Sequence, residues 1–215
     1  MSLFPAFLKL AHRPCLLVGA GEIALQKIPS LLAAEARLRV VAPRVDPKIA
    51  ALANEGRLEI VEREFTGADL DGIFLVVAAT DDPGVNAAVY DEAVARNILC
   101  NSVDDPPHCD FYFGSIVSRG DLQIAISTAG ESPALAQRLR VEIDEQLPAD
   151  LGPWLHDLGE LRRDVLAAYE PGEGRKLLLH QLAQRNLCDP QECPAQKLAL
   201  EARSFVAKAA KETIA

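Results

Sequence analysis

Long apolar runs are missing from this sequence. Although 49% of the 215 residues are hydrophobic, no uninterrupted run approaches the roughly 20 residues that a transmembrane helix needs. The apolar stretch at the N-terminus is short, contains Pro5 and Lys9, and has no small-residue cleavage site after it. We therefore expect a mature, soluble protein that does not associate with membranes.

An excess of basic charge is also missing. The chain has 22 Lys and Arg against 31 Asp and Glu, which gives a net charge of −9. Proteins that bind nucleic acid through its phosphates need a basic face. The composition therefore argues against nucleic acid as a partner.

Cysteine is scarce. Five cysteines, an odd number, in a chain without a secretory signal argue against a disulfide framework and predict a cytoplasmic location. Cys188 and Cys193 have a spacing that suits metal binding, yet no second Cys or His pair stands near them in sequence, and zinc usually needs four ligands. No metal site is therefore predicted.

Short apolar runs alternate with helical patterns from residue 14 to about residue 117. The runs are nearly continuous, which is typical of parallel strands covered on both faces. Asp82 can cap the third helix, with Pro83 at its first position. This order predicts an α/β fold with a Rossmann-like, doubly wound parallel sheet. The expected strands are Pro14–Val18, Leu38–Val41, Leu58–Val61, Phe74–Ala78 and Ile98–Asn101, and the expected helices are Ile23–Ala34, Pro47–Glu55 and Pro83–Arg96.

The pattern changes after residue 113. Phe113–Val117 and Leu122–Ser127 flank a turn-like tetrad and predict a β-hairpin. Ser132 before Pro133 predicts the start of a helix. A small hairpin with one helix buries little by itself, so we expect a homodimer built on residues 114–147. The remainder is expected to be helical, with breaks near residues 148–153, 170–174 and 189–194.

A glycine-rich motif lies between the first expected strand and the first expected helix. Residues 19–24, GAGEIA, fit the G-x-G-x-x-A pattern of dinucleotide-binding folds. Gly19 and Gly21 permit a tight turn and close approach of a pyrophosphate, and Ala24 lets the helix pack closely on the sheet. The helix N-terminus favours the anion. A strand before the motif and a helix after it favour a dinucleotide site over a simple turn.

The acid that usually follows the second strand is absent. Pro43 and Arg44 stand where an Asp or Glu normally binds the ribose hydroxyls. Arg44 is compatible with the 2′-phosphate of NADP, and it is equally compatible with a solvent-facing loop. The residues alone leave the choice between NAD and NADP open.

Polar residues end the fourth and fifth expected strands at the carboxyl edge of the sheet, where open α/β sheets bind ligands. Thr80 follows the fourth strand and can contact a cofactor. Asn101 ends the fifth strand, and Asp104 and Asp105 follow it. A carboxylate beside a dry cofactor pocket can act as a base, although two acids at the start of a Pro-rich turn are an equally good interpretation. His108 is the histidine nearest to this edge.

The ordered set CLLVGAGEIALQK, VVAP, AATDD, LCNSVDD and STAGESPALAQRLR resembles the precorrin-2 dehydrogenase and sirohydrochlorin ferrochelatase family, which includes the N-terminal part of siroheme synthase. The resemblance covers residues 1–150 and extends more loosely beyond them. It implies NAD-dependent oxidation of precorrin-2 to sirohydrochlorin, followed in many members by insertion of ferrous iron as a second substrate. The family's methyltransferase half does not fit into 215 residues, so a stand-alone form is expected.

The resemblance also implies roles for individual residues. Asp104 matches the family's key aspartate and is the expected base. Thr128 and Ala129 stand where Ser and Gly are usual in the family, and Glu131 is an added acid. The expected cofactor contacts are Gly19, Gly21, Glu22, Ile23, Pro43, Arg44 and Thr80. The expected substrate contacts are Asn101, Thr128, Gly130, Ser132, Arg119 and Arg138, with Arg140 as a further cation for a carboxylate-rich substrate.

Two alternatives remain open at this point. A non-catalytic dinucleotide-sensing module would bind its ligand without turnover, and an NADP-linked oxidoreductase of another small substrate is supported by Arg44. The expected partners are a tetrapyrrole substrate and a second copy of the chain. The expected domains are an NAD-binding Rossmann-like domain (residues 1–113), a dimerisation hairpin and helix (114–147) and a helical C-terminal domain (148–215).

Overall fold

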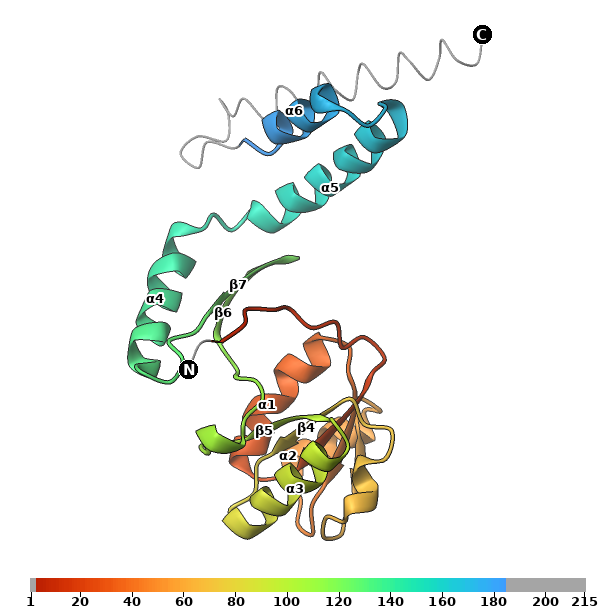
Figure 1. Cartoon of the computed structure of the whole chain (residues 1–215), viewed down its shortest axis with the longest axis vertical. Helices are drawn as coiled ribbons and strands as arrows, with labels where there is room; N and C mark the ends of the chain where they lie inside the picture. The colour runs from red at the N-terminus through yellow and green to blue at the C-terminus, as the bar shows by residue number, and fades with distance from the viewer. Residues whose placement is uncertain (1–2, 185–215) are drawn as a thin grey trace. The chain divides into compact units, whose positions relative to one another are not determined.

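The chain divides into two compact units in a computed structural model that describes residues 3–184 (Figure 1). The first unit ends at Phe113 and the second begins at Gly114. The predicted break near residues 189–194 and the pair Cys188 and Cys193 lie outside the described residues.

A five-stranded parallel sheet forms the centre of the first unit, with strand order β3-β2-β1-β4-β5. Each strand begins and ends within one residue of its expected position. The apolar runs of the central strands β1 and β4 are buried on both faces, as their near-continuous apolar character predicts. The strands are β1 (Pro14–Val18), β2 (Arg37–Val41), β3 (Glu59–Val61), β4 (Leu75–Ala78) and β5 (Leu99–Ser102).

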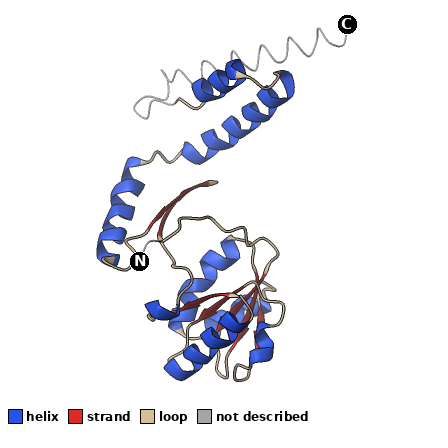
Figure 2. Ribbon diagram, viewed as in Figure 1, coloured by secondary structure: helices blue, strands red, loops and turns tan. Residues whose placement is uncertain are grey.

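Helices cover both faces of this sheet (Figure 2). On one face, α1 (Glu22–Ala33) and α2 (Pro47–Asn54) share a core with β1, β2 and β4. On the other face, α3 (Pro83–Ala95) and the 3-10 helix η1 (Gly67–Leu70) pack on the alternate residues of the strands. The expected doubly wound, Rossmann-like fold is confirmed.

The expected helix caps are confirmed by side-chain hydrogen bonds. Asp82 accepts bonds from the backbone N–H groups of Gly84 and Val85 at the start of α3. Ser132 accepts a bond from the N–H of Leu135 at the start of α4 (Pro133–Gln146). Each cap satisfies a donor that a helix N-terminus leaves without an internal partner.

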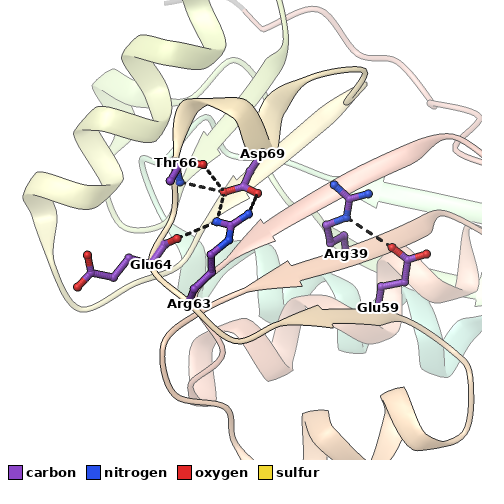
Figure 3. Close-up of polar contacts among 6 residues, drawn as sticks. All are labelled: Arg39, Glu59, Arg63, Glu64, Thr66 and Asp69. Carbon is purple, nitrogen blue, oxygen red and sulfur yellow. Dashed lines mark hydrogen bonds and ion pairs between the residues drawn. The ribbon is translucent and has the colours of Figure 1, made fainter.

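An ion pair stabilises the loop between β3 and η1 (Figure 3). The guanidinium of Arg63 donates two hydrogen bonds of 2.7 and 2.6 Å to the carboxylate of Asp69, a residue that is only 4% exposed. Thr66 adds bonds to the same carboxylate from its backbone N–H and its hydroxyl. These bonds lower the pKa of Asp69, chiefly through Arg63, so the carboxylate is held in its charged form.

The second unit joins a hairpin to helices. The strands β6 (Ser115–Arg119) and β7 (Leu122–Ile126) pair antiparallel, which confirms the expected hairpin. Strand β6 lies two residues later than expected, because Ser118 and Arg119 pair with β7 instead of forming the turn. The helices are α4 (Pro133–Gln146), α5 (Leu151–Ala168) and α6 (Glu173–Leu182).

The first expected break in the helical region is shorter than its predicted range of 148–153. Helix α5 begins at Leu151, which places Pro153 in its first turn, where the missing N–H of proline costs no hydrogen bond. Gly152 explains why the helix can start there, because a Cβ at this position would lie 2.9 Å from the carbonyl carbon of Arg119 in the hairpin. Within residues 3–184, none of the helices has the length and apolar character to cross a membrane.

Candidate functional site

The candidate site begins at the point where the sheet reverses its winding. Strands β1 and β4 are neighbours, but the helices that follow them lie on opposite faces, and this arrangement opens a crevice at the carboxyl ends of the strands. An open cleft of about 610 Å³ occupies this point. Its lining residues are Gly19, Ala20, Gly21, Glu22, Ile23, Ala42, Pro43, Arg44, Val45, Asp46, Ala79, Thr80 and Asp81. All seven expected cofactor contacts are among them.

The fold requires glycine at position 19, whether or not a ligand is bound. Its φ of +103° lies in a region that L side chains rarely adopt. A Cβ at this position would lie 2.4 Å from the carbonyl oxygen of Ala79, at the end of β4. Glycine here therefore lets the ends of β1 and β4 approach each other and form the floor of the cleft.

Gly21 has a different role. A Cβ at Gly21 would meet nothing within 4 Å, so the fold alone does not demand glycine. Gly21 is the N-cap of α1 and offers no side chain to the first amides of the helix, which leaves these donors available to an anion. The side chain of Ile23 is 43% exposed beside them. This part of the cleft therefore fits the pyrophosphate of a dinucleotide.

The segment after β2 contributes to the cleft an exposed cation, Arg44, and the carboxylate of Asp46, which caps a helix. Pro43 and Arg44 are both exposed on the cleft wall. Asp46 also lines the cleft, but its carboxylate accepts a 2.7 Å bond from the N–H of Lys48 and caps α2. Sequence reasoning missed Asp46, although the Asp46-Pro47 pair has the pattern of a helix start.

Thr80 is held in place by a residue that the sequence analysis did not single out. The hydroxyl of Thr80 donates a 2.7 Å bond to the side-chain carbonyl of Asn86, and the amide of Asn86 donates back to the Thr80 carbonyl. Asn86 is buried on α3. Its position one turn after the cap Asp82 was the available signal, but an isolated Asn in a helix does not indicate its partner.

Asp104 lies in a tight turn directly after β5. The N–H of Asp105 donates to the carbonyl of Ser102 at 3.2 Å and closes the turn. Asp104 takes a φ of +60°, in the left-handed region that glycine adopts readily and that asparagine and aspartate adopt occasionally. The N–H of Val103 donates to the carbonyl of Ala78, which ties this turn to the strand whose next residue, Ala79, lines the cleft.

The two acids of this turn differ. A 2.6 Å hydrogen bond joins the Asp105 carboxylate to Nδ1 of His108, whose ring lies against that of Tyr90 on α3. The side chain of Asp104 is exposed and has no hydrogen-bond or ion-pair partner among residues 3–184. Asp104 is therefore the carboxylate that remains available to a substrate.

Asn101 faces inward. It is buried, and its side-chain amide donates a 2.7 Å bond to the carbonyl of Phe111. This bond fastens residues 109–111 beside β5. The side-chain amide of Asn101, an expected substrate contact, is thus already used in a structural hydrogen bond.

The turn before α4 belongs to the second unit. Ala129 and Gly130 both have positive φ values, 52° and 89°. The hydroxyl of Thr128 accepts the N–H of Ser132, so Thr128 helps to order the turn. Ala129 occupies a left-handed position that glycine would fill with less strain, which gives a physical reason for the glycine that is usual in the resembled family.

The expected cations also differ in their availability. Arg119 donates bonds of 2.7 Å to the carboxylate and to the backbone carbonyl of Asp144, and a third of 3.2 Å to the carbonyl of Leu147. Its guanidinium therefore caps the C-terminal end of α4, a role that the sequence analysis did not predict. Arg138 is 70% exposed and pairs with Glu142 in the next turn. Among the described residues, Arg140 donates only to the side chain of Gln137.

Comparisons with known proteins match both units. A family model described as "Putative NAD(P)-binding" matches residues 6–115, about half of the chain, and a model described as "Sirohaem biosynthesis protein central" matches residues 119–146. The chain belongs to the NAD(P)-binding family of siroheme biosynthesis proteins.

Named relatives of this siroheme biosynthesis family cover most of the chain. Siroheme synthase 1 of Cronobacter sakazakii is 46% identical over 176 residues, which are 82% of this chain and 37% of the relative. Siroheme synthase of Chromobacterium violaceum is 45% identical over 171 residues, 80% of this chain and 36% of the relative. The chain thus spans little more than a third of these siroheme synthases.

A solved structure also matches almost the whole of this chain. SirC, precorrin-2 dehydrogenase, superposes with a TM-score of 0.75 at 26% identity, over 97% of this chain and 100% of that chain. The family's nicotinamide cofactor fits the cleft described above, where Gly21, the open amides of α1 and Ile23 meet. Among residues 3–184, no group of three or more His, Cys, Asp or Glu is arranged to hold a metal ion.

Proposed function

We propose that this chain catalyses the NAD-dependent dehydrogenation of precorrin-2 to sirohydrochlorin in siroheme biosynthesis. The observation that carries the proposal is the match to SirC over 97% of the chain, because the cleft by itself selects a dinucleotide and says nothing of a tetrapyrrole. The relatives named siroheme synthase point to the same pathway.

The arrangement at the sheet edge fits this reaction. Bound NAD supplies a hydride acceptor. Loss of hydrogen from the substrate also releases a proton, and the exposed Asp104 carboxylate at the neighbouring strand end can accept it. Asp105 is less suited to this role because it is paired with His108.

The test is an anaerobic incubation of the purified protein with precorrin-2 and NAD, in which sirohydrochlorin is followed by its absorbance. We expect NAD-dependent conversion with many turnovers per enzyme. NAD binding without conversion would support a dinucleotide-sensing module and would refute the dehydrogenase assignment.

Asp104→Asn is the sharpest variant for the proposed base. Asparagine tolerates the left-handed backbone that Asp104 adopts, so the turn is kept while the base is lost. We expect kcat to fall roughly a hundredfold or more, with little change in KM for NAD. Asp105→Asn is the matched control, and we expect it to lower kcat much less.

The choice of cofactor has a specific residue to test. Arg44 is exposed on the cleft wall and has no partner among the described residues, which favours the alternative of an NADP-linked oxidoreductase. We propose NAD, and we expect the protein to bind NAD more tightly than NADP. Tighter binding of NADP that is lost in Arg44→Ala would reverse this assignment.

Ferrochelation is a second activity of the same site that we propose. Insertion of ferrous iron releases two pyrrole protons, and the free Asp104 carboxylate can accept them. Adding ferrous iron to sirohydrochlorin made in the assay tests this activity. Siroheme formation no faster than without enzyme would exclude it.

We also propose a homodimer built on residues 114–147. In this proposal the turn at Thr128, Gly130 and Ser132 and the exposed cation Arg138 serve the substrate's carboxylates, and Arg119, which caps α4, is the less available of the two cations. Exposed apolar side chains within residues 114–147 support the homodimer. Ile116 on β6 is 45% exposed. Sedimentation analysis should give twice the chain mass of 23.2 kDa, and a monomer at all concentrations would exclude it.

A cytoplasmic location is part of the proposal. The described cysteines, Cys15, Cys100 and Cys109, are free thiols, which suits a reducing compartment. Fractionation of the source cells with an antibody against the chain would test it.

A further inference from the structure

The thiol of Cys109 contacts both ends of the turn that presents Asp104. This thiol faces two backbone carbonyls, at 3.0 Å from the oxygen of Ser102 and 3.3 Å from the oxygen of Asp105. These carbonyls belong to the first and last residues of the turn. The thiol is therefore placed to donate its single proton to either end of the turn that carries Asp104.

The sulfur also accepts a hydrogen bond from the central sheet. The side-chain amide of Asn101 donates to Sγ of Cys109 at 3.4 Å, and an isolated β-bridge pairs the backbones of the same two residues. The N–H of Asp110 donates to the carbonyl of Cys100, and the Asp110 carboxylate accepts the N–H of Cys100. The thiol is therefore anchored to β5, a strand of the central sheet.

The chemical state of the thiol suits a donor. Burial raises the pKa of Cys109 above its ordinary value, and the neighbouring Asp105 and Asp110 raise it further against the lowering effect of the bond to Ser102. The sulfur therefore keeps its proton at neutral pH and stays able to donate.

Asp104 needs such support. Its φ of +60° costs free energy for a residue with a side chain, and such a conformation persists only where the surroundings determine it. The exposed side chain of Asp104 makes no bond of its own within residues 3–184. The carboxylate's position thus depends on the turn beneath it.

We propose that Cys109 is a positioning residue for Asp104, holding the turn of residues 102–105 closed through its thiol. This inference rests on the proposed function, in which Asp104 is the base. A displacement of about 1 Å at a reacting group can cost up to a hundredfold in rate, so a hydrogen bond beneath the turn can affect catalysis without touching the substrate.

The first test measures the turn and needs no activity. The N–H of Asp105 closes the turn, and its hydrogen exchange, followed by NMR, reports how often the turn opens. We expect Cys109→Ala and Cys109→Val to speed this exchange about tenfold and Cys109→Ser to restore it, because serine keeps a donor and valine only fills the space. Cys15→Ala is the matched control, since Cys15 is a buried cysteine in β1 that does not line the cleft.

The second test measures the dehydrogenase. We expect Cys109→Ala to lower kcat about tenfold with KM for NAD unchanged, Cys109→Ser to recover most of the rate, and Cys15→Ala to keep the wild-type kcat. In the Asp104→Asn background, Cys109→Ala should cause no further loss, because residues that act through each other are not additive.

Each result decides the proposal. Unchanged exchange at Asp105 in the alanine and valine variants, an opened turn with wild-type kcat, or equal rate losses for serine and alanine would each overturn it. A wild-type protein that does not oxidise precorrin-2 would instead refute the proposed function, while the exchange data would still decide whether Cys109 holds the turn. Should the alanine variant fail to fold, the valine variant carries the comparison with serine.

Discussion

The two units of the chain bury very different amounts of apolar side chain. Of the hydrophobic residues that are buried within residues 3–184, 26 lie in the first unit and six in the second, namely Val117, Ala136, Leu151, Leu161, Val165 and Leu182. A parallel sheet covered on both faces supplies its own core. A hairpin and three helices that bury so little need further apolar contacts to be stable.

This difference indicates how the two units are built. The first unit can form its cleft from its own residues, because every lining residue lies before residue 82. The second unit leaves Ile116, Leu135 and Val141 each more than 40% exposed on the hairpin and α4. The proposed dimer would cover such side chains. Changes in the first unit should therefore act through its own core, and changes in the second through association.

The largest effect is expected from Gly19→Ala. The new Cβ would lie 2.4 Å from the Ala79 carbonyl and would impose an unfavourable φ, so we expect a loss of about 3 kcal/mol or more in the free energy of unfolding of the first unit. Urea denaturation measures it. Gly56→Ala is the control, because Gly56 has a positive φ but open space around it, and it should lose about 1 kcal/mol. Equal losses in both variants would show that the contact with Ala79 is unimportant.

The next effect is expected from Asp69→Ala, which removes the buried partner of Arg63 (Figure 3). Charged hydrogen bonds of this kind contribute about 2 kcal/mol. Glu59→Ala is the control: Glu59 and Arg39 form an exposed pair at 3.5 Å in the same unit, which should contribute about 0.5 kcal/mol or less. Similar losses for the two variants would contradict the larger stabilisation assigned to the pair of Arg63 with the buried Asp69.

The same residue gives a prediction for pH. The pKa of Asp69 is lowered in the folded state, so its contribution to stability is fully present above the pKa of the unfolded chain, about 3.9, and is lost as the pH falls through the folded value. We expect the urea concentration at the unfolding midpoint to decrease as the pH is lowered below about 4. In Asp69→Asn this decrease should be less steep. Identical pH profiles for the wild type and Asp69→Asn would show that Asp69 does not cause the loss of stability at low pH.

These variants also show which features of the fold and of the candidate site could be predicted from the sequence. The strands and the glycine motif follow from local patterns, namely apolar runs and the order of strand, G-x-G and helix. The closure of Gly19 against Ala79, the bond of Thr80 to Asn86 and the capping of α4 by Arg119 join residues from different elements. Their side-chain types are common and allow many partners, so only the fold identifies the one that is used.

The second unit is tested by Ile116→Asp. Ile116 lies on the opposite face of β6 from the buried Val117, and a charge there would have to be desolvated in the proposed interface. We expect the dissociation constant of the dimer to rise about thirtyfold, equivalent to roughly 2 kcal/mol, as measured by sedimentation. Val94→Asp on α3 changes a similarly exposed residue of the first unit and should leave the association unchanged. A dimer that survives Ile116→Asp intact would place the interface elsewhere.

The smallest effect separates binding from folding within the first unit. Gly21→Ala adds a Cβ that meets no protein atom but projects at the N-terminus of α1, where the pyrophosphate is expected. We expect NAD affinity, measured by calorimetry, to fall about tenfold, or roughly 1.4 kcal/mol, while the urea midpoint changes little. Gly72→Ala should do the reverse, because Gly72 has a φ of +73° and does not line the cleft. If Gly21→Ala destabilised the fold as Gly19→Ala does and left NAD binding intact, both glycines would be required for folding. The N-terminus of α1 would then not be the pyrophosphate-binding site.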